Sequence, residues 1–198
     1  GDANCRVGES KYLVIEADEH FASFLNYWPK MIVITNIEKE HLDYYKTLTN
    51  LKRNFRKFIM HLPKGGVLIT GKSVKQKDIK KLKKLLKVPG EHNAWNAAQA
   101  LVASRALNIS DSVSFKALSE YKGSWRRFEE KTIKLGAKRY TLISDYAHHP
   151  TEVKVTLKAA RTKYPKKKIW CVFQPHQYQR TYYLFGDFVR TFKKAPVD

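Results

Sequence analysis

The sequence predicts an α/β fold made of two units. Short β-branched or aromatic runs alternate with stretches of helical spacing along the 198 residues, and this order is typical of parallel strands joined by crossover helices. Polar clusters follow most of the apolar runs, which places them at the carboxyl ends of strands, where open α/β sheets bind ligands. A stretch rich in Ser, Asn and Asp at residues 108–114 predicts a division between residues 112 and 113.

The elements of the first unit follow from apolar spacing and from turn residues. Strands are expected where β-branched residues run together, and helices where apolar residues recur every three or four positions. Glycine and proline pairs at 65–66 and 89–90 separate the elements. The expected order is a strand at 12–17, a strand at 31–35, a helix at 44–62, a strand at 67–70, a lysine-rich helix at 73–87 and a small-residue helix at 93–107.

The second unit continues the alternation. A helix is expected to begin near Pro150, because proline is tolerated in a first turn and the acid that follows it favours the positive end of a helix. The expected order is a short helix at 115–121, a strand pair at about 127–144, a helix at 151–164, a strand at 169–174 and a last helix at 181–194.

Composition limits the classes of function. The net charge of +20 suggests a basic nucleic-acid-binding module. However, the lysines cluster on the polar faces of predicted helices, as in residues 73–87, where a stripe of Ile and Leu forms the apolar face. The sequence has no helix-turn-helix pattern, zinc-ligand spacing or basic patch interleaved with aromatic residues. No nucleic-acid partner is therefore expected, although a nucleotide would also suit the charge.

Location is predicted from apolar runs and cysteines. No apolar stretch approaches the roughly 18 residues that a membrane span needs, so no membrane partner is expected. Cys5 and Cys171 lie far apart and do not suggest a disulfide framework. With no signal peptide visible at the start, these features favour the reducing cytoplasm. The sequence gives no indication of the oligomeric state.

Two adjacent histidines stand where the apolar run at 140–143 ends. Asp145, His148 and His149 lie between this run and Pro150. These three side chains are therefore expected on the loop at the carboxyl end of a strand, where ligands bind. A metal-dependent hydrolase that uses the three is one hypothesis, although they lack the compact ligand spacing of a zinc site.

Two acidic clusters also follow predicted strands. Glu16 belongs to the run Glu-Ala-Asp-Glu-His after the first strand, and His41 is flanked by carboxylates after the second. Carboxylates at a strand end suit a magnesium ion or a phosphate-transfer site. The same residues also fit a polar loop after a strand and the acids that are common at helix starts.

Amides and guanidinium groups supply further candidates. Asn93 and Asn96 share one side of a helical turn, and asparagine amides match the donor–acceptor edge of adenine. Arg127 belongs to a basic pair suited to bidentate phosphate contact. Arg180 follows the strand expected at 169–174 and is suited to holding a carboxylate. Each residue also has a plain structural interpretation, as part of a helix cap or as an exposed polar surface.

The segment from Gly66 to Ser73 fits the phosphate-loop pattern letter for letter. In a true phosphate loop the strand precedes the first glycine, and the four middle residues wrap the phosphate with backbone N–H groups. Here the four middle residues, Val-Leu-Ile-Thr, are expected to form the strand itself. We therefore expect a turn, a strand and a second turn into the lysine-rich helix.

Taken in order, these motifs resemble those of the Mur ligases. The series is EADEHFASFL, TNIEKEHLDYY, PGEHNAWNAAQAL, RRFE, DYAHHPTEV and FQPHQYQRT, and it covers residues 12–181. The resemblance implies a central ATP-binding domain at 1–112 and an incomplete Rossmann-like C-terminal domain at 113–198. It also implies an ATP-dependent amide-bond ligase of peptidoglycan synthesis, with ATP and Mg²⁺ as cofactors. The last two motifs favour the branch whose substrates are UDP-N-acetylmuramate and L-alanine.

The resemblance also implies roles for residues on the nucleotide side. Glu16 and His41 would hold the magnesium ion. Asn96 would contact the adenine, and Asn93 would lie beside it near the nucleotide. Arg127 would approach the ATP phosphates, where a guanidinium offsets the charge of the transferring phosphoryl group.

A second set of roles concerns the remaining substrates. Asp145 would contact the ribose of ATP. His148 and Arg180 would line the pocket for the incoming amino acid and its carboxylate. His149 is expected to pack at the turn between strand and helix instead of binding a ligand.

The chain departs from the family pattern in several places. The family's N-terminal UDP-binding domain and its phosphate loop have no counterpart, so we expect a fragment that keeps nucleotide contacts but does not ligate alone. The stretch between His41 and His92 is shorter than is typical, so the central sheet is expected to be trimmed. Gln177 stands where the family usually has an arginine, Ser144 where it has an acid, and Glu40 where it has an aspartate.

Two alternatives remain open. A ligase that recycles murein peptide onto the UDP-sugar shares the EADE, HN and AHHP motifs, whereas the TNIE and FQPH stretches favour the alanine-adding branch. The nucleic-acid-binding module depends on the net charge alone.

Overall fold

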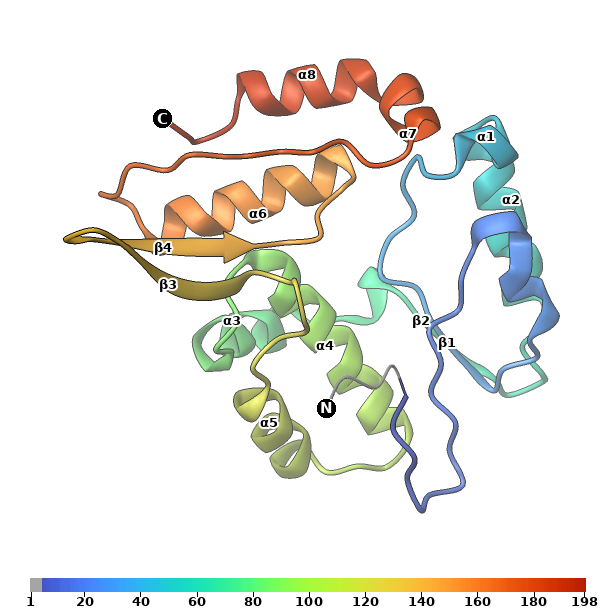
Figure 1. Ribbon diagram of the computed structural model, residues 1–198. Helices are drawn as coiled ribbons and strands as arrows, with labels where there is room; N and C mark the ends of the chain where they lie inside the picture. The colour runs from blue at the N-terminus through green and yellow to red at the C-terminus, as the bar shows by residue number, and fades with distance from the viewer. Residues whose placement is uncertain (1–4) are drawn as a thin grey trace.

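A computed structural model describes residues 5–198 of the chain, and it contains two small sheets with helices beside them (Figure 1). The α/β class expected from the sequence is confirmed, although each sheet of the described residues has only two strands. In chain order the elements are η1 (His20–Asn26), β1 (Met31–Val33), α1 (Leu42–Tyr45), α2 (Leu48–Ile59), β2 (Val67–Ile69), η2 (Gly71–Ser73), α3 (Gln76–Leu85), α4 (Glu91–Ala106), α5 (Asp111–Glu120), β3 (Glu129–Leu135), β4 (Lys138–Ser144), α6 (Pro150–Lys163), α7 (Tyr178–Tyr183) and α8 (Phe185–Lys193).

The first sheet pairs β1 with β2 in parallel, as expected when helices join two strands. Ile32 and Ile34 at β1 pack against Phe58 of α2. The side-chain amide of buried Gln99 on α4 donates a hydrogen bond to the Ile34 carbonyl at 3.2 Å. The amide therefore ties the middle of α4 to the residue that follows β1.

The expected helix at 44–62 is divided into α1 and α2. Lys46 between them has a φ of +65°, which interrupts the helical backbone. The Thr47 hydroxyl then accepts a hydrogen bond from the Asn50 backbone N–H at 3.1 Å and caps α2. The segment that fits the phosphate-loop pattern does not form a phosphate loop, as expected, because its middle residues form β2.

Helices α3, α4 and α5 share one apolar core. Leu82 of α3 and Leu101 of α4 are both completely buried, and Phe115 and Leu118 of α5 pack against the same cluster. The division expected between residues 112 and 113 would cut the first turn of α5. Because α5 packs with the first unit, we propose a division after this helix, within residues 121–125.

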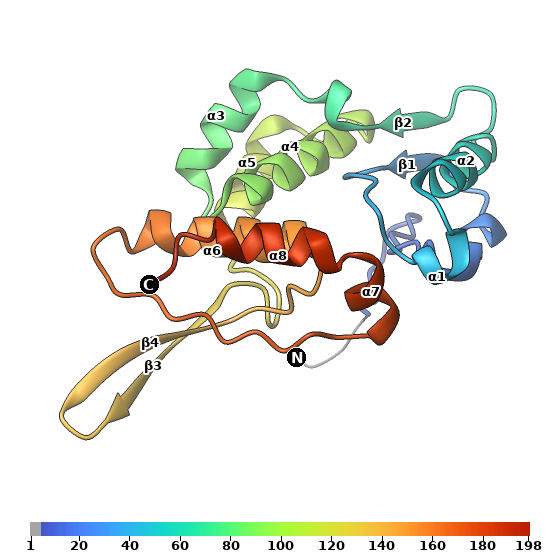
Figure 2. The same ribbon diagram turned by 90° about the horizontal axis from the view of Figure 1, so that it is seen from above.

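The second unit begins with an antiparallel hairpin of β3 and β4. The expected strand pair is confirmed, and its two strands are antiparallel. Gly136 in the short turn has a φ of +60°, which suits glycine and closes a tight hairpin. Phe128 before β3 packs against Ala159 and Ala160 of α6. Figure 2 shows the hairpin projecting beyond the helices, on the side away from α3.

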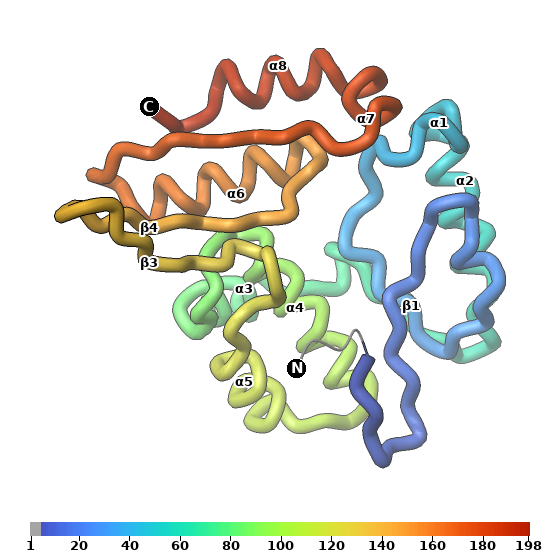
Figure 3. The backbone as a smooth tube through the Cα atoms, viewed as in Figure 1, coloured from blue at the N-terminus to red at the C-terminus, as the bar shows by residue number. Residues whose placement is uncertain are grey.

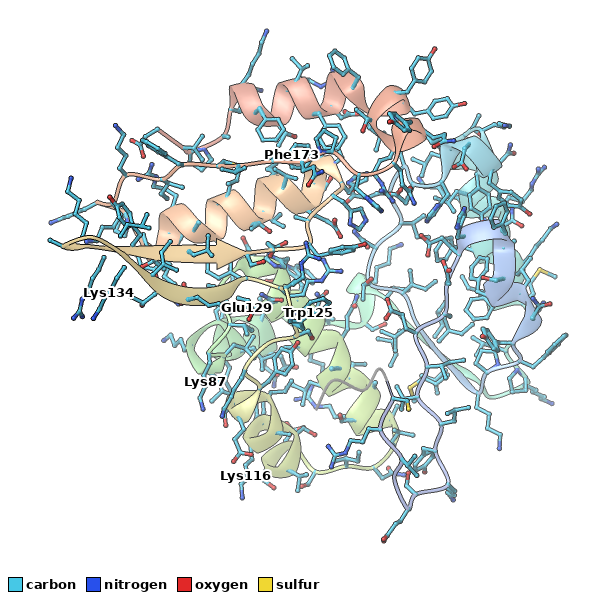
Figure 4. All side chains as sticks on the ribbon, in the orientation of Figure 1. Lys87, Lys116, Trp125, Glu129, Lys134 and Phe173 are labelled. Carbon is cyan, nitrogen blue, oxygen red and sulfur yellow. The ribbon has the colours of Figure 1, made fainter. Side chains whose placement is uncertain are left out.

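The strand expected at 169–174 is not formed. This segment runs between α6 and α8 as extended chain (Figure 3). Phe173, labelled in Figure 4, lies with its ring centroid 5.4 Å from that of Phe188 and 5.2 Å from that of Phe192. Val172 is 98% exposed. The apolar run therefore contacts α8, but the described residues provide no strand that pairs with it.

The strand expected at 12–17 is also not formed, for the same reason. Residues 12–17 have no strand structure, and Leu13 and Val14 are 84% and 89% exposed. A β-branched run becomes a strand only when a neighbouring strand takes up its backbone hydrogen bonds. Within residues 5–198, β1 and β2 pair only with each other.

The excess lysines lie on the surface. Lys87, Lys116 and Lys134 are exposed and extend from the periphery of the molecule (Figure 4). This arrangement agrees with the interpretation of the lysine-rich stretches as solvated helix and hairpin faces. None of the helices within residues 5–198 combines the length and apolar character needed to cross a membrane.

Candidate active site

The loop after β4 lies where the two units meet, and Asp145 organises its beginning. One carboxylate oxygen of Asp145 accepts from the Phe128 backbone N–H and the other from the Ala147 N–H, both at 2.8 Å. Phe128 has a φ of +53°, a conformation uncommon for an aromatic residue. Asp145 therefore fixes the start of β3 against the end of β4, and any ribose hydroxyl would have to use the remaining lone pairs of the same oxygens.

The two adjacent histidines have different environments. His149 caps α6: its Nδ1 accepts from the Thr151 backbone N–H at 3.2 Å. Nε2 therefore carries the proton, and it donates to the Lys39 carbonyl at 3.1 Å. Both ring nitrogens of His149 are used within the chain. The expectation that His149 packs at the strand–helix turn is confirmed.

His148 is turned toward a second group of rings. Its Nδ1 is 2.9 Å from the Tyr146 carbonyl. The ring lies 5.2 Å from the Tyr146 ring and 6.5 Å from that of His176, which precedes α7. The side chain of His148 therefore faces the same space as the segment that leads to Arg180, as the amino-acid-pocket prediction requires.

Glu152 joins this loop to Arg127. Its carboxylate accepts from the backbone N–H groups of His148 and His149 at 2.9 and 3.1 Å, and it lies 3.6 Å from the Arg127 guanidinium. Burial alone would raise the pKa of Glu152, but these N–H groups and the neighbouring positive charges hold it below its ordinary value. Glu152 is thus a permanent negative charge that orients Arg127, whose side chain is half exposed.

The N-terminus of α4 faces this loop from the first unit. His92 Nδ1 is buried and has no hydrogen-bond partner among the described residues. Burial is the main cause that lowers the pKa of His92, while Asp145 and Glu152 act against it and Arg127 adds to it. Gly90 has a φ of +101°, and a Cβ there would lie 2.5 Å from the His92 ring. The absence of a side chain at Gly90 therefore leaves room for the His92 imidazole at the N-terminus of α4.

The two candidate adenine ligands differ in their present contacts. The Asn93 amide donates to the Pro89 carbonyl at 2.6 Å and so helps to fix the turn that enters α4. Asn96 lies on the next turn and is exposed. Asn96 therefore offers its amide to a ligand, whereas Asn93 would need to exchange a bond that it already makes.

The candidate magnesium ligands do not form a metal site in this arrangement. Glu16 is exposed, while His41 is turned toward Glu19, with 3.5 Å between Nε2 and the carboxylate. The His20 ring stacks on His41 at 4.2 Å. Residues 5–198 contain no group of three or more His, Cys, Asp or Glu side chains placed to hold a metal ion. This result also leaves the metal-dependent hydrolase without a ligand set in the described chain.

Burial of His41 favours its neutral form. Burial lowers the pKa of His41 most strongly, Glu40 and Glu19 raise it, and His20 and Arg180 lower it. A neutral imidazole is the form that binds metal ions. Among the described residues, only one carboxylate, that of Glu19, lies beside the His41 ring, so a magnesium ion held by Glu16 and His41 would need Glu16 to move toward the ring.

The loop after β1 holds the two units together. Thr151 donates its hydroxyl proton to the Glu38 carboxylate, and His149 donates to the Lys39 carbonyl. Arg180 Nε donates to the Glu40 carboxylate at 2.7 Å, and Arg180 Nη1 donates to the His176 carbonyl at 3.1 Å. We call residues 38–40 with their partners Thr151, His149 and Arg180 the interdomain clasp.

Sequence reasoning missed several residues of this site. In the sequence, Glu152 indicates only the start of a helix, and Glu38 and Glu40 are only acids that flank His41. The partners of Glu38 and Glu40 lie 113 and 140 residues away in the chain, so no local pattern could pair them. His92 has a weak signal in its position between Gly90 and Asn93. Of the predicted residues, Arg127 and His148 contact Glu152, and Asp145 lies at the start of the same loop, whereas Glu16 is exposed on the segment before η1.

Similarity to known proteins covers both units. Residues 3–84 match the Mur ligase middle domain, and residues 126–198 match the Mur ligase, glutamate ligase domain. The chain is 38% identical to the UDP-N-acetylmuramate–L-alanine ligase of Clostridium acetobutylicum, over 96% of this chain and 50% of that protein. It is 37% identical to the protein of the same name from Clostridium botulinum strain Hall, over 98% of this chain and 50% of that protein.

The chain spans about half the length of the curated relatives it matches. The first of these alignments runs over 232 residues, more than the 198 of this chain, so the relative has residues inside the matched region that this chain lacks. The fold resembles the crystal structure of a UDP-N-acetylmuramate-alanine ligase from Thermotoga maritima. The TM-score is 0.64 at 23% identity, covering 88% of this chain and 46% of that one.

Proposed function

Because this chain belongs to the Mur ligase family, we propose that it supplies the nucleotide and amino-acid sites of a UDP-N-acetylmuramate–L-alanine ligase. The observation that best supports this proposal is the meeting of three motifs from both units. The Arg127 guanidinium lies 3.6 Å from the Glu152 carboxylate, and Arg127, Glu152 and Asp145 all act on the pKa of His92 at the N-terminus of α4. These are the elements to which the resemblance assigns the adenine, the phosphates and the ribose.

The proposed reaction activates a carboxylate before it forms an amide. A carboxylate oxygen of the UDP-sugar attacks the terminal phosphorus of ATP, and ADP leaves. The amine of L-alanine then attacks the acyl carbon, phosphate leaves, and the nitrogen loses a proton. Phosphorylation is needed because a carboxylate is a poor electrophile with a poor leaving group. The protein's part is to position the reactants and offset the charge that gathers on the phosphoryl oxygens.

Individual residues fit this chemistry to different degrees. Asn96 offers an exposed amide to the adenine, and Asp145 lies on the loop proposed to meet the ribose. Arg127, oriented by Glu152, would lie near the phosphates, where a guanidinium stabilises spread negative charge. Magnesium is expected with ATP, but Glu16 and His41 do not form its site as they now lie. Glu16 and His41 therefore have no role in the reaction as proposed here.

The amino-acid side of the proposed site combines His148 and Arg180. His148 faces His176 across the start of α7, and Arg180 is a buried guanidinium of the kind that binds carboxylates as a bidentate partner. Together they would orient L-alanine with its amine toward the acyl phosphate.

Titration of the chain with ATP tests the nucleotide part of this proposal. We expect ATP to shift the backbone NMR signals of residues 92–96, Arg127 and Asp145. Asn96→Ala should weaken ATP binding about tenfold, the effect of losing roughly 1.4 kcal/mol of hydrogen bonding. Asn26→Ala, which removes an exposed asparagine amide from η1, is the matched control and should bind ATP as the wild type does. ATP binding that is insensitive to Asn96→Ala, or that shifts other regions, would contradict the proposal.

A further inference from the structure

The guanidinium of Arg180 is already occupied by a carboxylate of the chain itself. The side chains of Arg180 and Glu40 are only 5% and 18% exposed, and the Nε–H of Arg180 is bonded to Glu40 at 2.7 Å. This is a short, charge-assisted hydrogen bond, the strong class of such bonds. A carboxylate ligand could reach this guanidinium edge only by replacing Glu40.

The space around this pair is too small for a second carboxylate. The cavity between residues 39–43 and α7 has a volume of about 10 Å³, and Glu40, Arg180 and Gln177 are among its lining residues. A cavity of this size holds at most one water molecule, since one water needs roughly 10–15 Å³. L-alanine is several times larger than water. The loop at 39–43 must therefore move away from α7 before an amino acid can enter.

The clasp provides separate contacts that such a movement would break. Glu40 binds Arg180 on α7, whereas Glu38 binds Thr151 at the start of α6. Both acids come from the one loop that joins β1 to α1. Of these two acids, only Glu40 binds the Arg180 guanidinium that an incoming carboxylate would use, and the His176 carbonyl accepts from its Nη1. The two acids therefore allow competition for Arg180 to be separated from general loosening of the clasp.

We propose that Glu40 acts as an internal competitor for Arg180, so that the carboxylate of the incoming amino acid binds only by displacing Glu40 and opening the clasp. This inference rests on the proposed function and names a residue that sets the affinity for the amino acid. The apparent affinity of a ligand falls in proportion to the fraction of molecules in the competent state. Glu40 lowers that fraction, and amino-acid binding in turn favours the open loop.

NMR of the Arg180 Nε–H group in the full chain tests this proposal. The wild type, Glu40→Gln and Glu38→Gln are each titrated with sodium acetate and with L-alanine, at ionic strength held constant with sodium chloride. We expect Glu40→Gln to bind both carboxylates about tenfold more tightly than the wild type, because a neutral amide competes poorly for the guanidinium. Glu38→Gln should remain within about twofold of the wild type, because its amide oxygen still accepts from Thr151.

Three controls show whether a change in affinity comes from misfolding or from binding that does not involve the carboxylate. Glu40→Asp keeps the charge but shortens its reach, so it should give a smaller gain than Glu40→Gln. L-alaninamide, which has no carboxylate, should gain nothing in any variant. The melting temperature of each variant checks that the fold is intact.

Each outcome has a defined meaning. Equal gains in Glu38→Gln and Glu40→Gln would show loosening of the loop and overturn the competition. No gain in Glu40→Gln would also overturn it, whatever the ATP titration shows. If Glu40→Gln gains affinity for acetate but L-alanine binds no better than acetate, the competition holds and the proposed amino-acid role of Arg180 is wrong.

Discussion

Residues 38–40 of the interdomain clasp and the N-terminus of α4 both face the second unit, but the polar groups of the two regions are satisfied to different extents. In the clasp, Glu38, the Lys39 carbonyl and Glu40 each have a hydrogen-bond partner across the junction. At α4, buried His92 Nδ1 has no partner among the described residues, and Asn96 is exposed. A buried polar group without a partner costs free energy, so proteins retain few of them. The difference indicates that the chain closes the side proposed for the amino acid with its own groups and leaves the side proposed for the nucleotide available.

Breaking the clasp should have the largest effect on stability. Arg180→Ala leaves the Glu40 carboxylate partly buried without its cation, and we expect a loss of about 3 kcal/mol in the free energy of unfolding. Arg190→Ala on α8 is the matched control, because its pair with Asp187 is exposed and should contribute less than about 0.5 kcal/mol. Urea denaturation measures both. Similar losses for the two variants would mean that the clasp does not stabilise the junction.

The α4 side can be disturbed through its glycine. Gly90→Ala places a Cβ 2.5 Å from the His92 ring and also strains a φ of +101°, and we expect a loss of about 2 kcal/mol. Gly136→Ala in the hairpin has a positive φ but no atom within 4 Å of the new Cβ, and should cost about 1 kcal/mol. Thermal or urea unfolding compares them. Equal losses of unfolding free energy in Gly90→Ala and Gly136→Ala would show that the His92 ring moves aside at no cost and is not held in place.

The two histidines separate the structural and ligand-binding roles of one loop. His149→Ala removes the cap of α6 and one clasp bond, so it should cost about 1 kcal/mol of unfolding free energy. His148→Ala loses one bond to a carbonyl and should cost about half as much. Chemical denaturation of the two alanine variants measures the difference. A larger loss for His148→Ala would reverse the assignment of the structural histidine.

The smallest expected effect is a dependence of stability on pH. Because burial lowers the pKa of His92 below its ordinary 6.5, the unfolded chain takes up this proton at a higher pH than the folded chain. The free energy of unfolding should therefore fall as the pH drops from about 6.5 toward the folded pKa. His92→Gln should reduce this slope. The slope that remains in His92→Gln should come from His41, whose pKa is also lowered by burial. A slope that is the same in His92→Gln and in the wild type would show that His92 does not contribute to this pH dependence.

Local sequence patterns predicted the helices, whose backbone hydrogen bonds are local. The apolar stripe of α3 and the small residues of α4 appear close to the expected positions. The strand within the phosphate-loop pattern also forms, because β1 lies beside it. The runs at 12–17 and 169–174 have the same apolar character as β1, yet they do not form strands. A strand depends on a distant neighbour for its hydrogen bonds, and a single run contains no information on whether that neighbour is present.

The site shows the same limit. Asp145, His148 and His149 could be placed on one loop because they follow a strand and precede a proline. Which of these residues is structural and which faces the proposed ligand site depends on contacts with Thr151, Lys39 and Glu152. The motif alone does not predict these contacts. Arg180 was expected to hold a carboxylate, and it does, but the carboxylate belongs to Glu40. The chemistry of the side chain was predictable, whereas its partner was set by packing between the two units.

One measurement tests most directly whether the amino-acid side is closed while the nucleotide side is open. It is the NMR of arginine side chains and backbone amides in the wild-type chain before and after saturation with ATP. We expect ATP to shift the signals of Asn96 and Arg127 while the Arg180 Nε–H remains hydrogen-bonded and slow to exchange with solvent. An Arg180 Nε–H that exchanges freely without ATP, or signals at α4 that ATP leaves unmoved, would contradict this account.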